Sequence, residues 1–345
     1  MAQRRRYRVI QWATGTIGTA SLRGVLDHPD FDLVGLYVTN PEKDGRDAGE
    51  LCGRGATGVE ATRNIDDILA LDADCVLYMP RQLTVEDVTQ LLASGKNVST
   101  TRVEFHHPPS MPEDLRRAVE AACKEGGTSL HGTGSSPGFA TEALPIPLLS
   151  MQRRLDRLTV NEYADVASRR SPEIIFDIMG FGAAPETFDA SRAAHLEHSF
   201  AGSMRQLADA IGKPIERFQT SAEVAVTRGD VEIAAGMLGA GTIGAQRISI
   251  TGFHAGEPLF VQRLNWYCTR EVDGGWDLRE TGWRVQVDGD TPLDVSITLP
   301  VAPENFAATT PGLTAHRAVN AVPAICAASP GLRTTLELPH ILPLF

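Results

Sequence analysis

Hydrophobic and polar positions follow two different patterns along the chain. From Arg8 to about Gly134, short apolar runs alternate with amphipathic segments, which is typical of βαβ units and a parallel sheet. Proline and glycine residues bound two expected helices, over residues 17–28 and 113–125. The strands that the pattern predicts in this part are 7–12, 31–38, 75–79, 97–100 and 129–132.

After about Met151 the apolar residues alternate with a period of two, which predicts strands over 217–227, 246–253, 259–267 and 283–287. Closely spaced turn signals lie between them, so we expect antiparallel pairs. An apolar helical stretch over 313–328 contains Pro323 and is expected to pack back on the first domain or on the seam.

The predicted fold class is therefore α/β. A Rossmann domain with a doubly wound parallel sheet is expected over residues 1–150, and a second α+β domain with a mainly antiparallel sheet over 151–310. The C-terminal helix and tail form the remainder, 311–345.

The composition is that of a globular protein and argues against nucleic-acid-binding and membrane-spanning classes. With 345 residues, 42% hydrophobic and 22% charged, the chain is of ordinary globular composition. A net charge of −11 argues against nucleic acid as a partner, and no apolar stretch is long enough to cross a membrane. The five cysteines form no Cys-x-x-Cys pair, which predicts a reduced, cytoplasmic protein without a metal site.

The clearest chemical signal is a glycine-rich turn between the strand 7–12 and the helix 17–28. It has the G-x-G-x-x-G spacing of a dinucleotide-binding turn, with Ala13 in the first position. Gly15 lets the backbone approach a pyrophosphate, Gly18 lets the helix close on the strand, and Ala13 is acceptable if its φ is negative. The alternative is an ordinary strand-to-helix turn. The cofactor-binding residues predicted here are Ala13, Thr14, Gly15, Thr16, Ile17 and Gly18.

A second glycine-rich stretch, 239–244, has the same spacing in a different context. The residues that follow alternate as a strand, so no helix N-terminus is offered to a phosphate. We interpret it as a turn.

The end of the strand 31–38 bears on the choice of cofactor. It has no acid at its tip, where an acid would accept the ribose hydroxyls and repel a 2′-phosphate. Thr39 and Asn40 can donate to a phosphate, and Lys43 and Arg46 lie just beyond, beside acids that dilute their charge. NADP(H) is favoured, NAD(H) stays possible, and a solvated loop is the alternative for the two basic residues. Further cofactor-binding predictions are Met79, Pro80 and Thr101.

Catalytic candidates follow the strand 97–100. Glu104 is preferred, because a carboxylate in an apolar cleft suits chemistry that passes through a cation. The alternative is that Glu104 only pairs with Arg102 or with a helix terminus on the surface. On an extended chain, His106 and His107 point to opposite faces and cannot bind one metal well, although either could be a general acid.

The strand 129–132 opens into a turn rich in glycine and hydroxyl side chains. This turn could pass close to a nicotinamide ring, with Phe139 as an apolar wall of the pocket. An ordinary connection between domains is the alternative.

Several short segments form a recognisable set together, namely 10–15, 45–53, 77–78, 94–98, 132–134 with 137–139, and 318–323. The set resembles the native amine dehydrogenases, which are related to 2,4-diaminopentanoate dehydrogenase and often labelled dihydrodipicolinate reductase-like. The resemblance spans nearly the whole chain. It implies a Rossmann domain joined to an α+β domain, a homodimer, and NAD(P)H-dependent reductive amination of an aldehyde or ketone with ammonia, or the reverse deamination.

The resemblance also implies roles for single residues. Glu104 occupies the family position that holds ammonia or the amine, and Phe139 the position that forms a wall of the pocket. Asn320 lies in a matching segment and is also expected in the substrate pocket. Ala13 departs from the usual first glycine. Arg169 and its neighbour Arg170 stand where an aromatic pocket residue is expected. If either faces the pocket, it can hold a carboxylate; two arginines on a solvated turn are the alternative.

The sequence thus predicts an NAD(P)-dependent oxidoreductase acting on a C–N bond, with a small carbonyl compound or amine and ammonia as its partners. Two alternatives stay open: a carbonyl or imine reductase that uses His106 or His107 as proton donor without ammonia, and a dinucleotide-binding sensor without turnover. The lysine-pathway reductase is not expected, because its His-His pair lies in the substrate domain and is followed closely by a lysine, unlike His106-His107.

Overall fold

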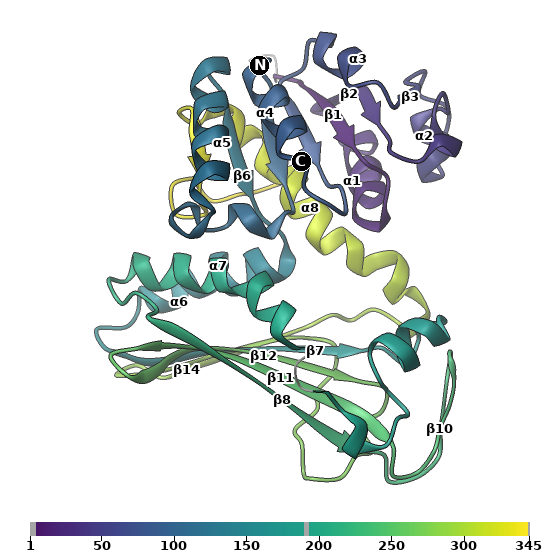
Figure 1. Cartoon of the computed structure of the whole chain (residues 1–345), viewed down its shortest axis with the longest axis vertical. Helices are drawn as coiled ribbons and strands as arrows, with labels where there is room; N and C mark the ends of the chain where they lie inside the picture. The colour runs from purple at the N-terminus through teal and green to yellow at the C-terminus, as the bar shows by residue number, and fades with distance from the viewer. Residues whose placement is uncertain (1–4, 190–192, 344–345) are drawn as a thin grey trace. The chain divides into compact units, whose positions relative to one another are not determined.

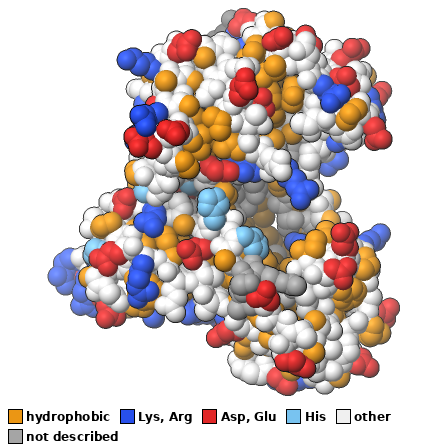
Figure 2. Space-filling view, viewed as in Figure 1, with side chains coloured by type: hydrophobic (Ala, Val, Ile, Leu, Met, Phe, Trp, Pro, Cys, Tyr) orange, Lys and Arg blue, Asp and Glu red, His pale blue; other side chains and the backbone are white. Residues whose placement is uncertain are grey.

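The computed structural model describes residues 5–189 and 193–343. The chain folds into two compact units: unit 1 contains the residues up to 139 and from 310 onward, and unit 2 contains residues 140–309 (Figure 1). Within the described ranges, the structure has no helix of the length and apolar character that crossing a membrane requires. On the face seen in Figure 2, acidic and basic side chains are interspersed over unit 1.

Unit 1 is built on a parallel sheet whose strand order is β15-β6-β5-β4-β1-β2-β3. The order reverses at the neighbouring strands β1 and β4, as in a doubly wound sheet. The five predicted strands are confirmed, whereas β3 and β15, of two and three residues, are too short for a periodic pattern. The strands are β1 (Tyr7–Trp12), β2 (Phe31–Tyr37), β3 (Ala61–Thr62), β4 (Cys75–Tyr78), β5 (Asn97–Thr100), β6 (Ser129–Gly132) and β15 (Gly331–Arg333).

Helices cover both faces of this sheet (Figure 1). On one face, α8 packs Ala318 and Val322 against Val9 and Leu77. On the other, α4 and α5 contribute to a core that contains Val76 and Val98. The C-terminal helix therefore belongs largely to the core of unit 1. The helices are α1 (Thr16–Leu26), α2 (Ala48–Cys52), α3 (Ile65–Ala70), α4 (Val85–Ala93), α5 (Glu113–Gly126) and α8 (Phe306–Ala327).

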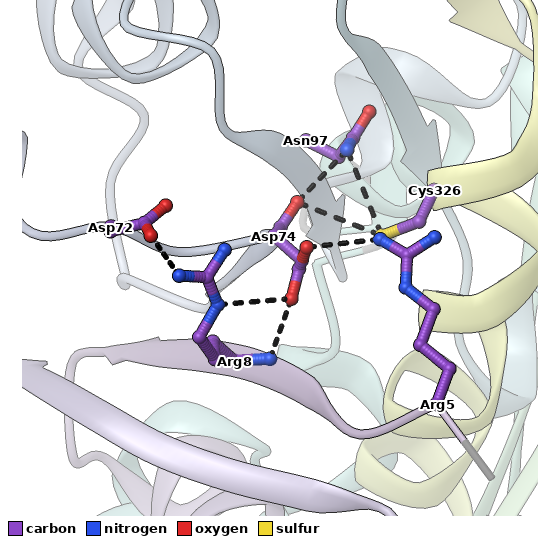
Figure 3. Close-up of polar contacts among 6 residues, drawn as sticks. All are labelled: Arg5, Arg8, Asp72, Asp74, Asn97 and Cys326. Atoms are coloured by element: carbon purple, nitrogen blue, oxygen red, sulfur yellow. Dashed lines mark hydrogen bonds and ion pairs between the residues drawn. The ribbon is translucent and has the colours of Figure 1, made fainter. Parts of the chain in front are cut away.

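Polar contacts tie the amino ends of the strands to the end of α8 (Figure 3). The Asp74 carboxylate accepts from the Arg8 backbone N–H at 2.8 Å and from the Arg5 guanidinium at 3.0 Å. The Asp74 carbonyl accepts from Asn97 Nδ2 at 2.9 Å and from Cys326 Sγ at 3.6 Å. These contacts stabilise the edge opposite to the carboxyl ends of the strands.

Unit 2 contains a six-stranded sheet of order β14-β13-β7-β12-β11-β8. Four of its pairs are antiparallel, as expected, but β7 and β12 run parallel in the middle, so the sheet is mixed. The helices α6 (Pro145–Leu149) and α7 (Ala194–Ala210) lie along it (Figure 1). A hairpin of β9 (Val231–Ile233) and β10 (Gly236–Leu238) forms a separate two-stranded sheet, which packs Ile233 and Leu238 in one core with Ile243 of β11. The strands are β7 (Leu155–Asp165), β8 (Arg217–Val226), β11 (Ile243–His254), β12 (Glu257–Tyr267), β13 (Gly282–Gly289) and β14 (Leu293–Thr298).

The second glycine-rich stretch is a turn, as interpreted from the sequence. Thr242 N–H donates to the Gly239 carbonyl at 3.2 Å, and the chain continues directly into β11, which pairs antiparallel with β8. No helix begins here.

Candidate active site

The glycine-rich turn joins β1 to α1 with an open space above Gly15. No heavy atom lies within 4 Å of the position that a Gly15 Cβ would take. A Cβ on Gly18 would lie 2.2 Å from the Ala13 carbonyl oxygen, so the close packing of turn and helix requires glycine there. Thr16 and Ile17 form the first turn of α1, whose free N–H groups favour an anion. These features fit a dinucleotide pyrophosphate.

The backbone of Ala13 does not have the negative φ under which an alanine was acceptable at this position. Its φ is +72°, in the left-handed region that costs a residue with a side chain about 1–2 kcal/mol. Hydrogen bonds hold it there: Ala13 N–H donates to the Tyr37 carbonyl at 2.8 Å, and Gln11 Nε2 donates to the Ala13 carbonyl at 3.0 Å. The turn thus has the shape that a glycine would give, and the condition under which alanine was acceptable, a negative φ, is not met.

The residues after β2 reach the glycine-rich turn. Lys43, at the end of the 3₁₀ turn Pro41–Lys43, donates from Nζ to both the carbonyl and the hydroxyl oxygen of Thr14 at 2.9 Å. Asn40 caps the same turn by accepting from Glu42 N–H at 3.0 Å, and Thr39 and Asn40 are exposed. The structure therefore brings Thr39, Asn40 and Lys43 to the β2 side of the turn.

Met79, Pro80 and Thr101 directly follow β4 and β5. Met79 N–H donates to the Trp12 carbonyl at 3.1 Å, which joins the end of β4 to the end of β1. Because parallel strands end at the same edge of a sheet, these residues share the edge of the glycine-rich turn. All the predicted cofactor-binding residues lie along that edge.

Glu104 lies just beyond this edge, in the 3₁₀ turn Val103–Phe105. Its carboxylate forms a bidentate pair with Arg102: Arg102 Nε donates to Glu104 Oε2 at 3.1 Å, and Arg102 Nη2 donates to Oε1. The two side chains are 19% and 22% exposed, respectively. The ion pair that was the alternative for Glu104 is thus present, but it is largely buried and not a surface pair.

The two adjacent histidines are buried, with His106 3% and His107 6% exposed. The chain is not extended at His106, whose φ and ψ are −70° and −33°, so the argument from opposite faces of an extended chain does not apply. His107 Nδ1 lies 2.6 Å from Ser110 Oγ. Among the described residues, no group of three or more His, Cys, Asp or Glu side chains is arranged to hold a metal.

The segment after β6 packs directly on the segment that carries Glu104. A Cβ on Gly132 would lie 3.0 Å from Phe105 Cβ, and one on Gly138 would lie 3.5 Å from His106 Cε1. Phe139 is half-buried, and its N–H donates to the Gly134 carbonyl at 2.8 Å. The structure therefore places the segments of Glu104 and Phe139 side by side.

Buried hydroxyl groups in this segment were not singled out from the sequence. Thr133 is 1% exposed, and its Oγ1 has no hydrogen-bond partner among the described residues; the same holds for the buried Oγ of Ser136. A buried hydroxyl without a partner is costly, which marks both as groups that a bound molecule can satisfy. The only signal in the sequence was the hydroxyl-rich composition of the turn.

The two other predicted pocket residues lie in different units. Asn320 is half-buried on α8 in unit 1, two residues beyond Ala318, whose carbonyl accepts from Ser99 Oγ of β5 at 2.8 Å. Arg169 and Arg170 are exposed on the turn after β7 in unit 2, where Arg169 N–H donates to the Val166 carbonyl at 3.0 Å. A role for Arg169 in a pocket stays a prediction.

Family comparisons divide the chain into two parts. Residues 9–107 match the model of the dihydrodipicolinate reductase N-terminus, and residues 144–344 match the 2,4-diaminopentanoate dehydrogenase C-terminal domain. The chain belongs to the 2,4-diaminopentanoate dehydrogenase family. The reductase match is confined to the nucleotide-binding half. The resemblance stated from the sequence is thereby confirmed.

Relatives of this 2,4-diaminopentanoate dehydrogenase family member cover most of its length. An amine dehydrogenase from Streptomyces virginiae is 29% identical over 96% of this chain and 95% of that protein. A 2,4-diaminopentanoate dehydrogenase from Acetoanaerobium sticklandii is 25% identical over 79% of this chain and 76% of that protein. An amine dehydrogenase structure from Mycobacterium smegmatis has a TM-score of 0.76 at 20% identity, covering 98% of this chain and 97% of that one, and confirms the fold.

Proposed function

We propose that this protein is an NAD(P)H-dependent amine dehydrogenase that aminates an aldehyde or ketone with ammonia and catalyses the reverse deamination. The observation that carries the proposal is the largely buried Glu104 carboxylate at the edge where the glycine-rich turn ends. Family membership and the amine dehydrogenase relative at 29% identity support the same reaction class, that of oxidoreductases acting on CH–NH2 groups.

The chain's own residues fit the dinucleotide cofactor. The open space above Gly15 and the N–H groups of the first turn of α1 would hold the pyrophosphate, with Lys43 on the side of β2. When bound, the cofactor supplies the hydride. We assign cofactor binding and the ammonia site at Glu104 to unit 1, and dimerisation and further substrate binding, with Arg169 as the candidate, to unit 2. A reduced, cytoplasmic setting stays a prediction.

The reaction balances as carbonyl compound, ammonia, NAD(P)H and one proton giving amine, NAD(P)⁺ and water. Glu104 accepts an N–H of ammonia and orients its lone pair toward the carbonyl carbon. Loss of water from the adduct gives an iminium, and the Glu104 carboxylate stabilises its positive charge. This attraction is stronger in a largely buried site than in water, because the local dielectric constant is lower.

The experiment that tests this function measures NAD(P)H oxidation with aldehydes, ketones and keto acids, each with and without ammonium at a mildly alkaline pH. Consumption only with ammonium supports reductive amination, and its dependence on a substrate carboxylate reports on Arg169. Equal consumption without ammonium would instead identify a carbonyl reductase, with His106 or His107 as proton donor. Tight cofactor binding without any turnover would favour the sensor.

NADPH is the cofactor that we propose to be preferred, and Lys43 gives the test. Replacing Lys43 by alanine should raise the KM for NADPH about 10- to 30-fold, because one charge-assisted contact contributes about 1.5–2 kcal/mol. The KM for NADH should change much less. Steady-state kinetics with both cofactors measures the ratio, and Lys124→Ala on the exposed side of α5 is the control. An equal rise in KM for NADPH and NADH would show that Lys43 only holds Thr14 in place and does not contact the 2′-phosphate.

We also propose a homodimer that forms through the face of the second sheet opposite α7. Arg263 lies in the middle of this face, on β12, between Asn161 of β7 and Ser249 of β11. It is half-buried, and it has no hydrogen-bond or ion-pair partner among the described residues. Burial, followed by repulsion from Arg247 and Arg157, lowers the pKa of Arg263 below its usual value. A carboxylate from a second copy would relieve this repulsion. Glu223 on the same face, which lies 4.0 Å from Arg247 of its own chain and already attracts Arg263, is the candidate.

The charge reversal Arg263→Glu should convert the dimer to a monomer, because it places like charges at a self-complementary interface. Light scattering coupled to size exclusion measures the mass. Arg117→Glu, which changes an exposed side chain of α5, should leave the dimer intact. A monomeric wild type, or a dimeric Arg263→Glu variant, would contradict this interface.

A further inference from the structure

The Arg102–Glu104 pair is held at two further points, both through Arg102. Arg102 Nη1 donates to the Arg81 carbonyl after β4 at 2.6 Å, and Arg102 N–H donates to Thr100 Oγ1 at 3.1 Å. Thr100 Oγ1 in turn donates to the Tyr78 carbonyl at 2.7 Å. The guanidinium is therefore anchored on the segment after β4, while the backbone of Arg102 is held at the end of β5. Together these contacts give the paired carboxylate one defined position.

We propose that Arg102 is the positioning residue of the ammonia site: it fixes the Glu104 carboxylate in the orientation that receives ammonia and limits the attraction of the site for cations. This inference rests on the proposed function of Glu104. It goes beyond that function because it gives a second residue, Arg102, a role in whether the site binds neutral ammonia or the ammonium ion.

The lone pairs of the Glu104 carboxylate are not all used by Arg102. Each oxygen of an ionised carboxylate accepts about two hydrogen bonds. The bidentate contact with Arg102 uses one on each oxygen, which leaves acceptor capacity on both for the N–H groups of ammonia. A lysine in place of Arg102 would keep the charge but not the two parallel hydrogen bonds.

The net charge of the Arg102–Glu104 pair also affects which nitrogen species binds. The pair is neutral as a whole, so ammonium or potassium ions from bulk solvent are attracted less strongly than they would be to an unpaired carboxylate. A group bound on the side of the carboxylate away from Arg102 lies closer to the negative charge of Glu104 than to the positive charge of Arg102. The site therefore still stabilises the iminium. The pair therefore favours neutral ammonia, which is the nucleophilic form, in the ground state.

The test compares Arg102→Gln and Arg102→Lys with the wild type at saturating cofactor and carbonyl substrate. In Arg102→Gln we expect kcat to fall about 10- to 100-fold, as displaced catalytic groups do, while the KM for total ammonium at neutral pH falls. Potassium chloride should become a competitive inhibitor against ammonium at concentrations that leave the wild type unaffected. Arg102→Lys should restore part of kcat and show no potassium inhibition.

The controls separate positioning from loss of structure. The affinity for NADPH and the thermal midpoint should stay close to those of the wild type in both variants. Arg116→Gln removes an arginine that pairs with Glu120 on the exposed face of α5, and its kinetics should be unchanged. If Arg102→Gln does not fold, the kcat of Arg102→Lys tests the proposal. A wild-type kcat in Arg102→Lys would show that the bidentate pair is not needed.

The outcomes distinguish this inference from the proposed function. If Glu104→Gln is inactive while both Arg102 variants keep the wild-type kcat and KM for ammonium, Glu104 keeps its role and the inference about Arg102 is wrong. A higher KM for ammonium without potassium inhibition in Arg102→Gln would also overturn it. If Glu104→Gln keeps its activity, the proposed role of Glu104 fails, and the role of Arg102 fails with it.

Discussion

Replacing Glu104 by alanine is expected to abolish turnover, with kcat at least about 1,000-fold lower and cofactor binding nearly intact. A group that transfers or holds a proton in the reaction contributes about 100- to 10,000-fold, and here the same carboxylate also stabilises the iminium. Glutamine is the cleaner substitution, because its amide oxygen can still accept from Arg102 while the negative charge is removed. The measurements are kcat with ammonium and the dissociation constant for NADPH.

A matched control for this prediction lies on α5, where Glu120 pairs with Arg116 on the exposed surface. Glu120→Gln removes an equivalent charge from an Arg–Glu pair and should leave both quantities unchanged, since exposed pairs contribute little. Activity of Glu104→Gln within about twofold of the wild type, a difference of less than 1 kcal/mol in barrier, would remove Glu104 from the mechanism.

The second large effect is expected at the glycine-rich turn, where two substitutions of the same kind should differ. Gly15→Ala meets no atom within 4 Å, so the fold should keep its stability while the new methyl group blocks the approach of the pyrophosphate. Affinity for the cofactor should fall about 10- to 100-fold, since hydrogen bonds to charged groups contribute about 1.5–3 kcal/mol. Gly18→Ala places Cβ 2.2 Å from the Ala13 carbonyl oxygen, so it should also destabilise unit 1 by about 1–3 kcal/mol.

Thermal denaturation with and without NADPH separates the two effects. For Gly15→Ala we expect an unchanged midpoint without cofactor and a smaller increase on adding NADPH than in the wild type. For Gly18→Ala we expect the midpoint itself to be lower. Wild-type cofactor affinity in Gly15→Ala would place the pyrophosphate elsewhere, whatever the behaviour of Gly18→Ala.

Much of unit 1 could be predicted because several signals in the sequence agree. The strands β1, β5 and β6 have the predicted bounds, and α5 begins after a proline and ends at glycine, as its end signals indicate. In unit 2, β7 and α7 were not predicted. The middle of β7, residues 158–161, alternates apolar and polar side chains, but all four are buried, so the residue types do not indicate that both faces are covered. Likewise, the parallel pairing of β7 with β12 depends on contacts between distant segments.

In the candidate site, too, features set by the local sequence could be predicted, whereas features set by contacts between distant segments could not. The location of Glu104 follows from its place after a parallel strand, and that reasoning needs only the local pattern. The pairing with Arg102 was foreseen as an alternative, but its burial and the anchor on the Arg81 carbonyl depend on how β4 and β5 lie together. The positive φ of Ala13 likewise comes from the Tyr37 and Gln11 contacts, because alanine itself favours a negative φ.

The central claim, that ammonia is a substrate, is tested most directly by following the nitrogen atom. The enzyme is incubated with NADPH, a carbonyl substrate that is consumed in the ammonium-dependent assay, and ammonium labelled with the heavy nitrogen isotope. We expect an amine product that carries the label, in an amount equal to the NADPH oxidised, and no such product with Glu104→Gln. Formation of the alcohol from the same carbonyl, with NADPH oxidised and no label incorporated, would contradict it.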